Sequence, residues 1–207
     1  MPPTNSQPYE IVGMPADIYI AAVGATFPDI DATPNPTDWT KLGTNGSLNY
    51  TPDGVKAGQP QSFNIWRSLG SAAPRKVFRT EEDGKYGVSV ADMTLEQLTQ
   101  AIGGLTPTAV VAGGGTAAYK KIGLSRGLNI ATVALFIRVP GGSPYIADGN
   151  LQYEIPYAQY TGSPEVTWKR DNPAIIDMEW MALVDPNAAS DDEQLGRIVA
   201  QTGASAS

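Results

Sequence analysis

Two carboxylates stand two residues apart in the segment PAIIDMEWMALVDP, at Asp177 and Glu179. On a β-strand they would project from one face with their backbones about 6.6 Å apart, which overlaps the carboxyl separations used in glycoside hydrolysis. A carboxylate-dependent glycoside hydrolase is therefore one alternative. Nothing else in the sequence marks either residue as a proton donor, so we favour a simpler interpretation. In it, the pair forms the acidic face of a strand that meets water or a polar lumen.

A second alternative depends on aromatic side chains. Trp66 and Trp168, together with tyrosines, have the flat faces on which a carbohydrate-binding β-sandwich module stacks sugar rings. Tryptophans are also common in protein cores and in subunit interfaces. We favour core or interface roles for both residues and keep sugar binding as the less favoured function.

The residue types that the chain lacks exclude much chemistry. It has no cysteine and no histidine, so thiol nucleophiles, disulfides, the usual zinc ligands and the usual near-neutral proton shuttle are missing. The run Gly113 to Gly115 lacks the Gly-Lys-Ser/Thr ending of a phosphate-binding loop. A net charge of -7 repels polyanions. The sequence predicts no catalytic residues, no cofactor, no metal site and no tight grip on nucleic acid.

Most of the chain has the hydrophobic pattern of β-strands. Bulky residues alternate with small or polar ones in 86–90 and 173–186, and the apolar segment 17–23 is also expected to be a strand. The nearly continuous apolar run 127–140 is typical of a central strand that is buried on both faces, or of a strand with one face buried by another subunit. That run is far shorter than the roughly 18 residues of a membrane helix, so no membrane partner is expected. The fold class predicted is mainly β, with two packed antiparallel sheets in a sandwich-like or barrel-like arrangement.

One short flanking helix is expected near 94–103. Thr94 fits its N-cap, Gln97 is the capping-box partner three residues on, and Gly103-Gly104 provides a C-cap. A helix of this length is not stable alone, so its apolar stripe should dock on the sheet. The stripe consists of Leu95, Leu98 and Ile102.

Two dipeptides predict turns between strands. Asn45-Gly46 suits a type I′ hairpin turn, and Asp83-Gly84 suits a turn between the strand positions on either side of it. Pro156 predicts an edge or a bulge in the strand 151–162. Frequent turns agree with the 22 glycines and 17 prolines.

Two parts of the single domain 1–207 lack the apolar area to fold unaided. A protruding hairpin arm is expected at about 51–75, and an extended tail at about 185–207. An isolated hairpin is marginally stable in water, so each part needs a partner surface, and the overall profile suits self-assembly. The candidate interface residues are Phe63, Ile65, Trp66, Arg67, Leu69, Arg75, Leu195, Arg197 and Ile198.

Three segments, taken in order, resemble the major tail tube proteins of bacteriophages with long, non-contractile (siphovirus-type) tails. DIYIAAVGATFPDIDATPNPTDWTKLGTNGSLNYTPDGVK, 17–56, is similar to that family's opening strand, proline-rich connection, "W-x-x-L-G" and "G-x-L-x-Y-x-x-D-G-V". RTEEDGKYGVSVADMTLEQLTQAIGG, 79–104, resembles its strand followed by "T-L-E-x-L-x-x-A-x-G", and ALVDPNAASDDEQLGRIVAQ, 182–201, resembles its close. Together they cover more than a third of the chain. The segments 104–121 and 164–172 have no counterpart in the family pattern.

The resemblance implies a structural virion protein. In that family six copies close a ring by joining their sheets into a continuous barrel, and the rings stack into a tail tube, made in the host bacterial cytoplasm, through which genome DNA is delivered. It implies further partners: tail terminator, tape measure and distal tail proteins. DNA would pass without specific binding, which agrees with the acidic balance of the chain.

Overall fold

The computed structural model describes residues 10–102, 106–125 and 127–204. Twelve named strands and one α-helix account for its regular structure, with two short 3₁₀ helices, η2 and η3. Among these residues no helix is long and apolar enough to cross a membrane. In chain order the elements are β1 (Asp17–Ala22), β2 (Thr40–Lys41), η2 (Gly46–Asn49), β3 (Tyr50–Gly58), β4 (Gln61–Trp66), β5 (Lys76–Glu82), β6 (Lys85–Val90), α1 (Leu95–Ala101), β7 (Thr108–Val110), β8 (Tyr119–Lys121), β9 (Thr132–Val139), β10 (Leu151–Tyr160), β11 (Ile176–Ala182), η3 (Asp191–Glu193) and β12 (Arg197–Ala200).

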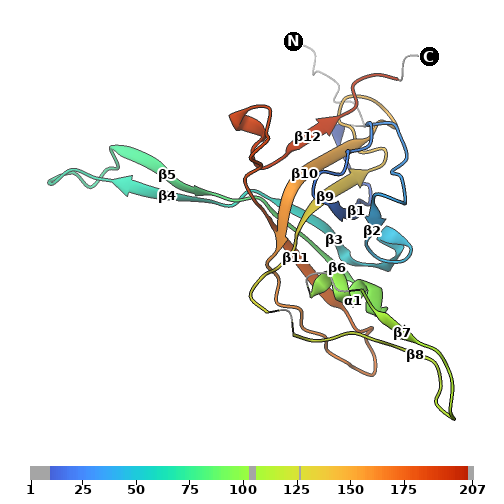
Figure 1. Ribbon diagram of the computed structural model, residues 1–207. Helices are drawn as coiled ribbons and strands as arrows, with labels where there is room; N and C mark the ends of the chain where they lie inside the picture. The colour runs from blue at the N-terminus through green and yellow to red at the C-terminus, as the bar shows by residue number, and fades with distance from the viewer. Residues whose placement is uncertain (1–9, 103–105, 126, 205–207) are drawn as a thin grey trace.

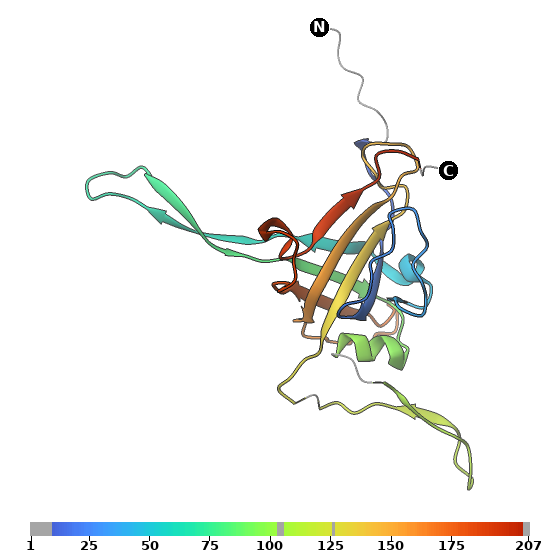
Figure 2. The same ribbon diagram turned by 45° about the horizontal axis from the view of Figure 1, so that its top comes forward.

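The body is one antiparallel eight-stranded sheet that curls over itself (Figures 1 and 2). Its strands follow the order β2-β1-β9-β10-β11-β6-β3, with β12 also paired to β10. Strand β10 makes the bend: its first half pairs with β12 and its second half with β11, and the register shifts between Ile155 and Ala158, at Pro156. The mainly β, sandwich-like class is therefore confirmed, although the two layers belong to a single continuous sheet.

The main core lies inside this curl. Alternate residues of β11 are fully buried, as the period of a one-sided strand requires, and their neighbours on β6 and β9 pack against them. Trp180 contacts Tyr160 edge to face, with ring centroids 5.8 Å apart. The buried cluster comprises Ile18, Ile20, Leu42, Tyr86, Val88, Val90, Ala101, Leu135, Ile137, Ile155, Ala158, Tyr160, Ile176, Met178, Trp180 and Ala182.

A second, smaller cluster covers the outer face of β1 and β9, so β9 is buried on both faces, as its apolar run predicts. Trp39 stacks near Phe27 and Phe136, with ring centroids 5.1 and 5.5 Å away, and its indole N–H donates to the Thr26 carbonyl. The proline-rich connection between β1 and β2 therefore packs on the sheet. Buried Arg138 fixes the connection by donating to the carbonyls of Asp29 and Ala32, each at 3.0 Å.

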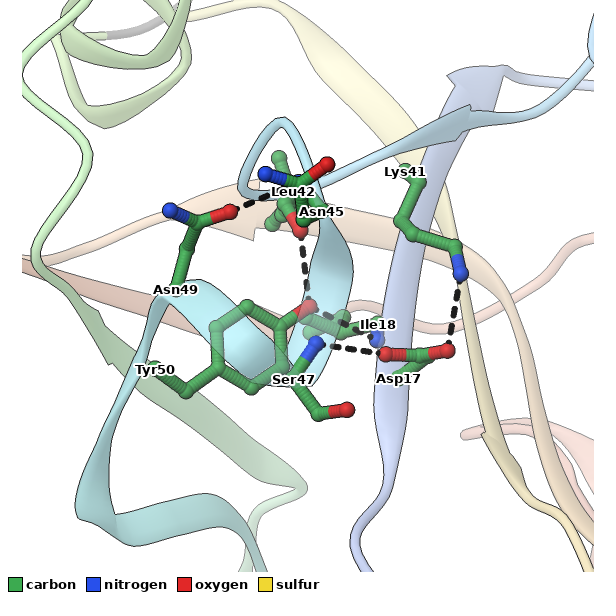
Figure 3. A network of polar contacts seen from close by, with 8 residues as sticks. All are labelled: Asp17, Ile18, Lys41, Leu42, Asn45, Ser47, Asn49 and Tyr50. Atoms are coloured by element: carbon green, nitrogen blue, oxygen red, sulfur yellow. Dashed lines mark hydrogen bonds and ion pairs between the residues drawn. The ribbon is translucent and has the colours of Figure 1, made fainter.

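The curled sheet does not close by strand pairing, but a polar network bridges its two ends (Figure 3). The Tyr50 hydroxyl accepts a hydrogen bond from the Ile18 N–H at 3.2 Å and donates to the Leu42 carbonyl at 2.8 Å. Beside it, Asp17 accepts from the Ser47 N–H at 2.8 Å and forms an ion pair with Lys41 at 2.8 Å. Side-chain groups thus satisfy backbone groups that a closed barrel would pair strand to strand.

The helix α1 covers one open end of the curl and contacts β11 (Figure 2). Its N-cap is Thr94, as expected, but Gln97 does not complete a capping box. The side-chain oxygen Oε1 of Gln97 accepts from the Gly43 N–H at 2.9 Å, and Asp92 accepts from the Thr94 N–H. All three residues of the expected stripe, Leu95, Leu98 and Ile102, are half-buried, and of these Leu98 packs against the core cluster that includes Ala101. The expected Gly103-Gly104 cap lies outside the described residues.

Two turn predictions are wrong. Gly46 has the expected positive φ of 61°, but Asn45 has φ -115°, and the chain enters the 3₁₀ helix η2 instead of a hairpin turn. At 83–84 the chain does not reverse: it leaves β5 and continues directly into β6. As a result β3–β4 and β5–β6 form one long ribbon, of which one half lies in the body sheet and the other half stands alone.

Candidate subunit interface

The free half of this ribbon is the hairpin arm, residues 61–82, which projects far from the body (Figures 1 and 2). Its location differs from the predicted 51–75, because 51–58 pair with β6 within the body sheet. Every residue of β4 and β5 is exposed. The arm therefore contributes nothing to the core of its own chain.

Both faces of the arm carry large apolar side chains. The register pairs Ile65 with Val77 on one face and Asn64 with Phe78 on the other, since directly opposed residues of an antiparallel pair project to the same side. Phe63 is 55% exposed, Trp66 51% and Phe78 46%. A ribbon that is apolar on both faces needs cover on both, so it is suited to lie between neighbouring molecules.

The arm is also basic. Residues 61–80 contain no acidic side chain, and the predicted interface residues Arg67 and Arg75 flank the tip, where Leu69 is fully exposed. The tip is held in shape by its own hydrogen bonds: Arg75 N–H to the Trp66 carbonyl at 3.0 Å, and Arg67 Nε to the Ala72 carbonyl at 3.1 Å. Arg67 thus keeps its two terminal nitrogens for another partner. The four basic residues are Arg67, Arg75, Lys76 and Arg79.

A bulge at the base of the arm aligns two charges. The register shifts between Ser62 and Phe63, so that Thr80 is the extra residue on β5. In a regular strand residues 79 and 82 would project to opposite faces. With the bulge between them, Arg79 and Glu82 form an ion pair at 2.6 Å. Both residues line a cleft of about 580 Å³ at the place where the arm leaves the body.

The other wall of this cleft is the C-terminal corner, residues 184–198. The sequence places Leu195, Arg197 and Ile198 in a tail without its own support, but most of this tail folds on its own chain. Leu195 packs against the core, and β12 pairs with β10. Arg197 donates to the buried carboxylate of Glu154 at 2.7 Å, which raises the pKa of Arg197. Ile198 remains 56% exposed at the cleft.

Asp177 and Glu179 lie on the exposed face of β11. Asp177 accepts a hydrogen bond from the Ser89 hydroxyl at 2.5 Å. Neither residue lines the cleft at the arm base or the smaller cleft beside Phe27 and Pro156. Within the described residues no group of three or more Asp, Glu, His or Cys is placed to hold a metal ion. Neither of these two clefts therefore encloses the two carboxylates.

The two tryptophans of the sugar-binding alternative lie on different segments. Trp66 is on the arm, and Trp168, 73% exposed, is in the loop between β10 and β11. Neither of them lines either cleft. No described pocket brings the pair together as a stacking platform.

A second, smaller hairpin, β7–β8, projects from the body near α1 (Figure 2). The glycine run 113–115 forms its tip, where Gly113 and Thr116 bridge and Gly114 and Gly115 have φ of 56° and 82°. The Lys120 ammonium binds the Glu96 carboxylate of α1 at 2.6 Å. The hairpin thus has one polar attachment to the helix.

Sequence reasoning missed the half of the interface that comes from β5 and the cleft. Val77, Phe78 and Arg79 lie opposite β4 on the arm. The signal for them in the sequence was the β-branched Val77 beside the aromatic Phe78, two residue types that are enriched in strands. The cleft combines Tyr153 with residues from 57–59, 79–86 and 184–198. Only the tertiary fold brings those segments together.

A scan against protein-family models finds no model that matches this chain, and a search of curated proteins finds no similar sequence.

Proposed function

We propose that this protein is a structural subunit that self-associates into stacked rings, and that these rings form a tail tube of the siphovirus type that conducts DNA. The observation that carries the proposal is the arm, whose large apolar residues are about half exposed on both faces and lie outside the core of the described chain. A monomer that exposed such a ribbon would be prone to association. Association between copies covers it.

Two further features support assembly through repeated copies. The arm and the body surface that could receive it are different parts of the molecule, and such heterologous contacts generate rings or filaments. The curled sheet also ends in strands whose outer edges have no strand partner within the described chain, at β2 and β3. Free edges can pair with a neighbouring sheet. A ring of six copies, with terminator, tape measure and distal tail proteins at the ends of the tube, is the form that we expect.

The test replaces residues 64–78 with Asn-Gly, a two-residue turn between the paired residues Phe63 and Arg79. The variant keeps the whole body core, so its circular dichroism and unfolding midpoint should match those of the wild type. Negative-stain electron microscopy should show tubes or rings for the wild type and small particles for the variant. Tubes of normal length from the variant would remove the arm from the assembly.

A further inference from the structure

The cleft at the base of the arm has the chemistry to receive a partner. Tyr86 and Tyr153 line it with their rings in edge contact, 6.4 Å between centroids, and the exposed apolar side chains of Val184 and Ile198 border it. Its volume of about 580 Å³ is that of a typical ligand pocket. Figure 2 shows the corner that carries η3 beside the point where the arm leaves the body.

The charges at this cleft leave an acidic excess. Its two cations are already engaged: Arg79 with Glu82 at 2.6 Å, and Arg197 with Glu154 at 2.7 Å and Glu193 at 3.6 Å. Asp191 accepts a hydrogen bond from the neutral Gln194 amide at 3.0 Å. Among the described residues no cation forms an ion pair with Asp191 or Asp192, which also line the cleft. An occupant with an apolar tip and positive charge would complement this surface.

The arm tip has both properties. Leu69 is fully exposed, and Arg67 and Arg75 flank it with no acidic residue within 61–80. The internal hydrogen bonds of the tip hold its shape before any contact, which lowers the entropy lost on binding. Guanidinium groups match carboxylates in geometry and form charge-assisted hydrogen bonds with them.

The tip cannot reach the cleft of its own chain. The cleft lies at the base of the arm, and the arm runs away from it for six residues of β4, about 20 Å at 3.3 Å per residue. We infer that the cleft receives the arm tip of a second copy, with Leu69 between the apolar borders and Arg67 and Arg75 facing Asp191 and Asp192. This inference rests on the proposed self-association. It specifies a heterologous contact that repeats from copy to copy.

Cysteine cross-linking tests the contact directly, because the chain has no cysteine of its own. The variant Leu69→Cys, Ile198→Cys carries one thiol on the tip and one at the cleft. A short bismaleimide reagent should convert its assemblies into a ladder of dimers, trimers and larger products. The single variant Leu69→Cys and the matched pair Leu69→Cys, Val111→Cys, with the second thiol on the exposed β7–β8 hairpin, should give no ladder.

A charge exchange gives the second readout. Arg67→Glu, Arg75→Glu should raise the protein concentration needed for assembly by about tenfold or more, and so should Asp191→Lys, Asp192→Lys. The combination of all four substitutions should restore much of the wild-type behaviour. Lys121→Glu, an exposed charge reversal on β8, is the control and should assemble normally.

The outcomes separate this inference from the proposed function. A ladder together with rescue by the charge exchange supports both. Wild-type tubes without a ladder, or with tip-to-tip dimers only, overturn the cleft as the acceptor but leave tube assembly in place. A wild type that sediments as a monomer at every concentration, with no ladder, overturns both.

Discussion

The hydroxyl of Tyr50 stands where a closed barrel would have strand pairing. From β3 at one end of the curled sheet it satisfies the Ile18 N–H and the Leu42 carbonyl, which both lie at the β2-β1 end (Figure 3). Burial raises the pKa of Tyr50, so the hydroxyl keeps its proton. We predict that Tyr50→Phe lowers the free energy of unfolding by about 1–3 kcal/mol, because two backbone groups lose their partner. Urea denaturation measures this loss.

The control for that substitution is Tyr119→Phe. Tyr119 lies exposed on β8, so loss of its hydroxyl should change the free energy of unfolding by less than about 0.5 kcal/mol. Equal effects at the two positions would mean that the polar network between the two ends of the sheet does not depend on the Tyr50 hydroxyl.

Asp92 fastens the N-terminus of α1 to the loop before η2. Burial opposes its ionisation, but the hydrogen bonds from Thr44 and from Thr94 outweigh burial and lower the pKa of Asp92 below its ordinary value. A lowered folded-state pKa gives stability that is complete above the unfolded-state pKa and is lost as the pH falls through the folded-state pKa.

We therefore predict that Asp92→Asn is less stable than the wild type at pH 7 and that its stability falls less steeply below about pH 4. Unfolding curves at several pH values between 2 and 7 measure both effects. Parallel pH profiles for the two proteins would show that Asp92 is not a source of the acid sensitivity.

At the scale of elements, Arg138 determines whether the proline-rich connection stays on the sheet. Its guanidinium donates to two carbonyls of that connection and to the Gln152 side chain, at 2.7 Å. We predict that Arg138→Lys opens residues 27–38 locally, since one ammonium cannot reproduce the fixed fork of donors. Amide hydrogen exchange in this segment should become faster, while exchange in β11 stays slow.

Arg170→Lys is the matched control, because Arg170 is exposed in the loop before β11. Unchanged protection of 27–38 in Arg138→Lys would show that the aromatic contacts of Trp39 alone hold the connection.

The elements themselves were predictable to different degrees. The buried positions of β9 and β11 and the N-cap Thr94 followed from hydrophobic period and capping chemistry, which are local. The prediction of a hairpin turn at Asn45-Gly46 was wrong. Gly46 packs against Asp17 and Lys41, and these tertiary contacts determine the backbone conformation there. The attachment of β12 to β10 was not predictable, since the buried Glu154 that holds Arg197 lies 43 residues earlier in the chain.

For the whole molecule, the sequence indicated that an arm needs a partner but could not supply the surface that receives it. The exposed apolar residues of FNIWRSLG are visible in the sequence. Their second strand and the acceptor cleft depend on how the ribbon leaves the sheet and on where the C-terminal corner folds. Such a site is composed of distant segments, so local periodicity carries no signal for it.

The distribution of charge predicts that assembly weakens the binding of polyanions, because assembly covers the cations of the arm. The arm, residues 61–82, carries four cations and two carboxylates, so it accounts for +2 of a net charge of -7 and leaves -9 on the rest of the chain. When arms are covered by neighbouring copies, the remaining surface is more acidic than that of the free subunit. We predict that free subunits bind heparin or DNA weakly at low salt and that assembled tubes bind neither.

Co-sedimentation with labelled DNA at about 50 mM salt compares the two states at equal protein concentration. The arm variant Arg67→Ser, Arg75→Ser should lose the weak binding of the free subunit, whereas Lys121→Ser, on the other hairpin, should retain it. Tubes that retained DNA as tightly as free subunits would show that the cations of the arm remain accessible after assembly. The acidic balance of the chain would then not explain free passage of DNA, because guanidinium groups exposed inside the tube would bind the phosphates of the DNA.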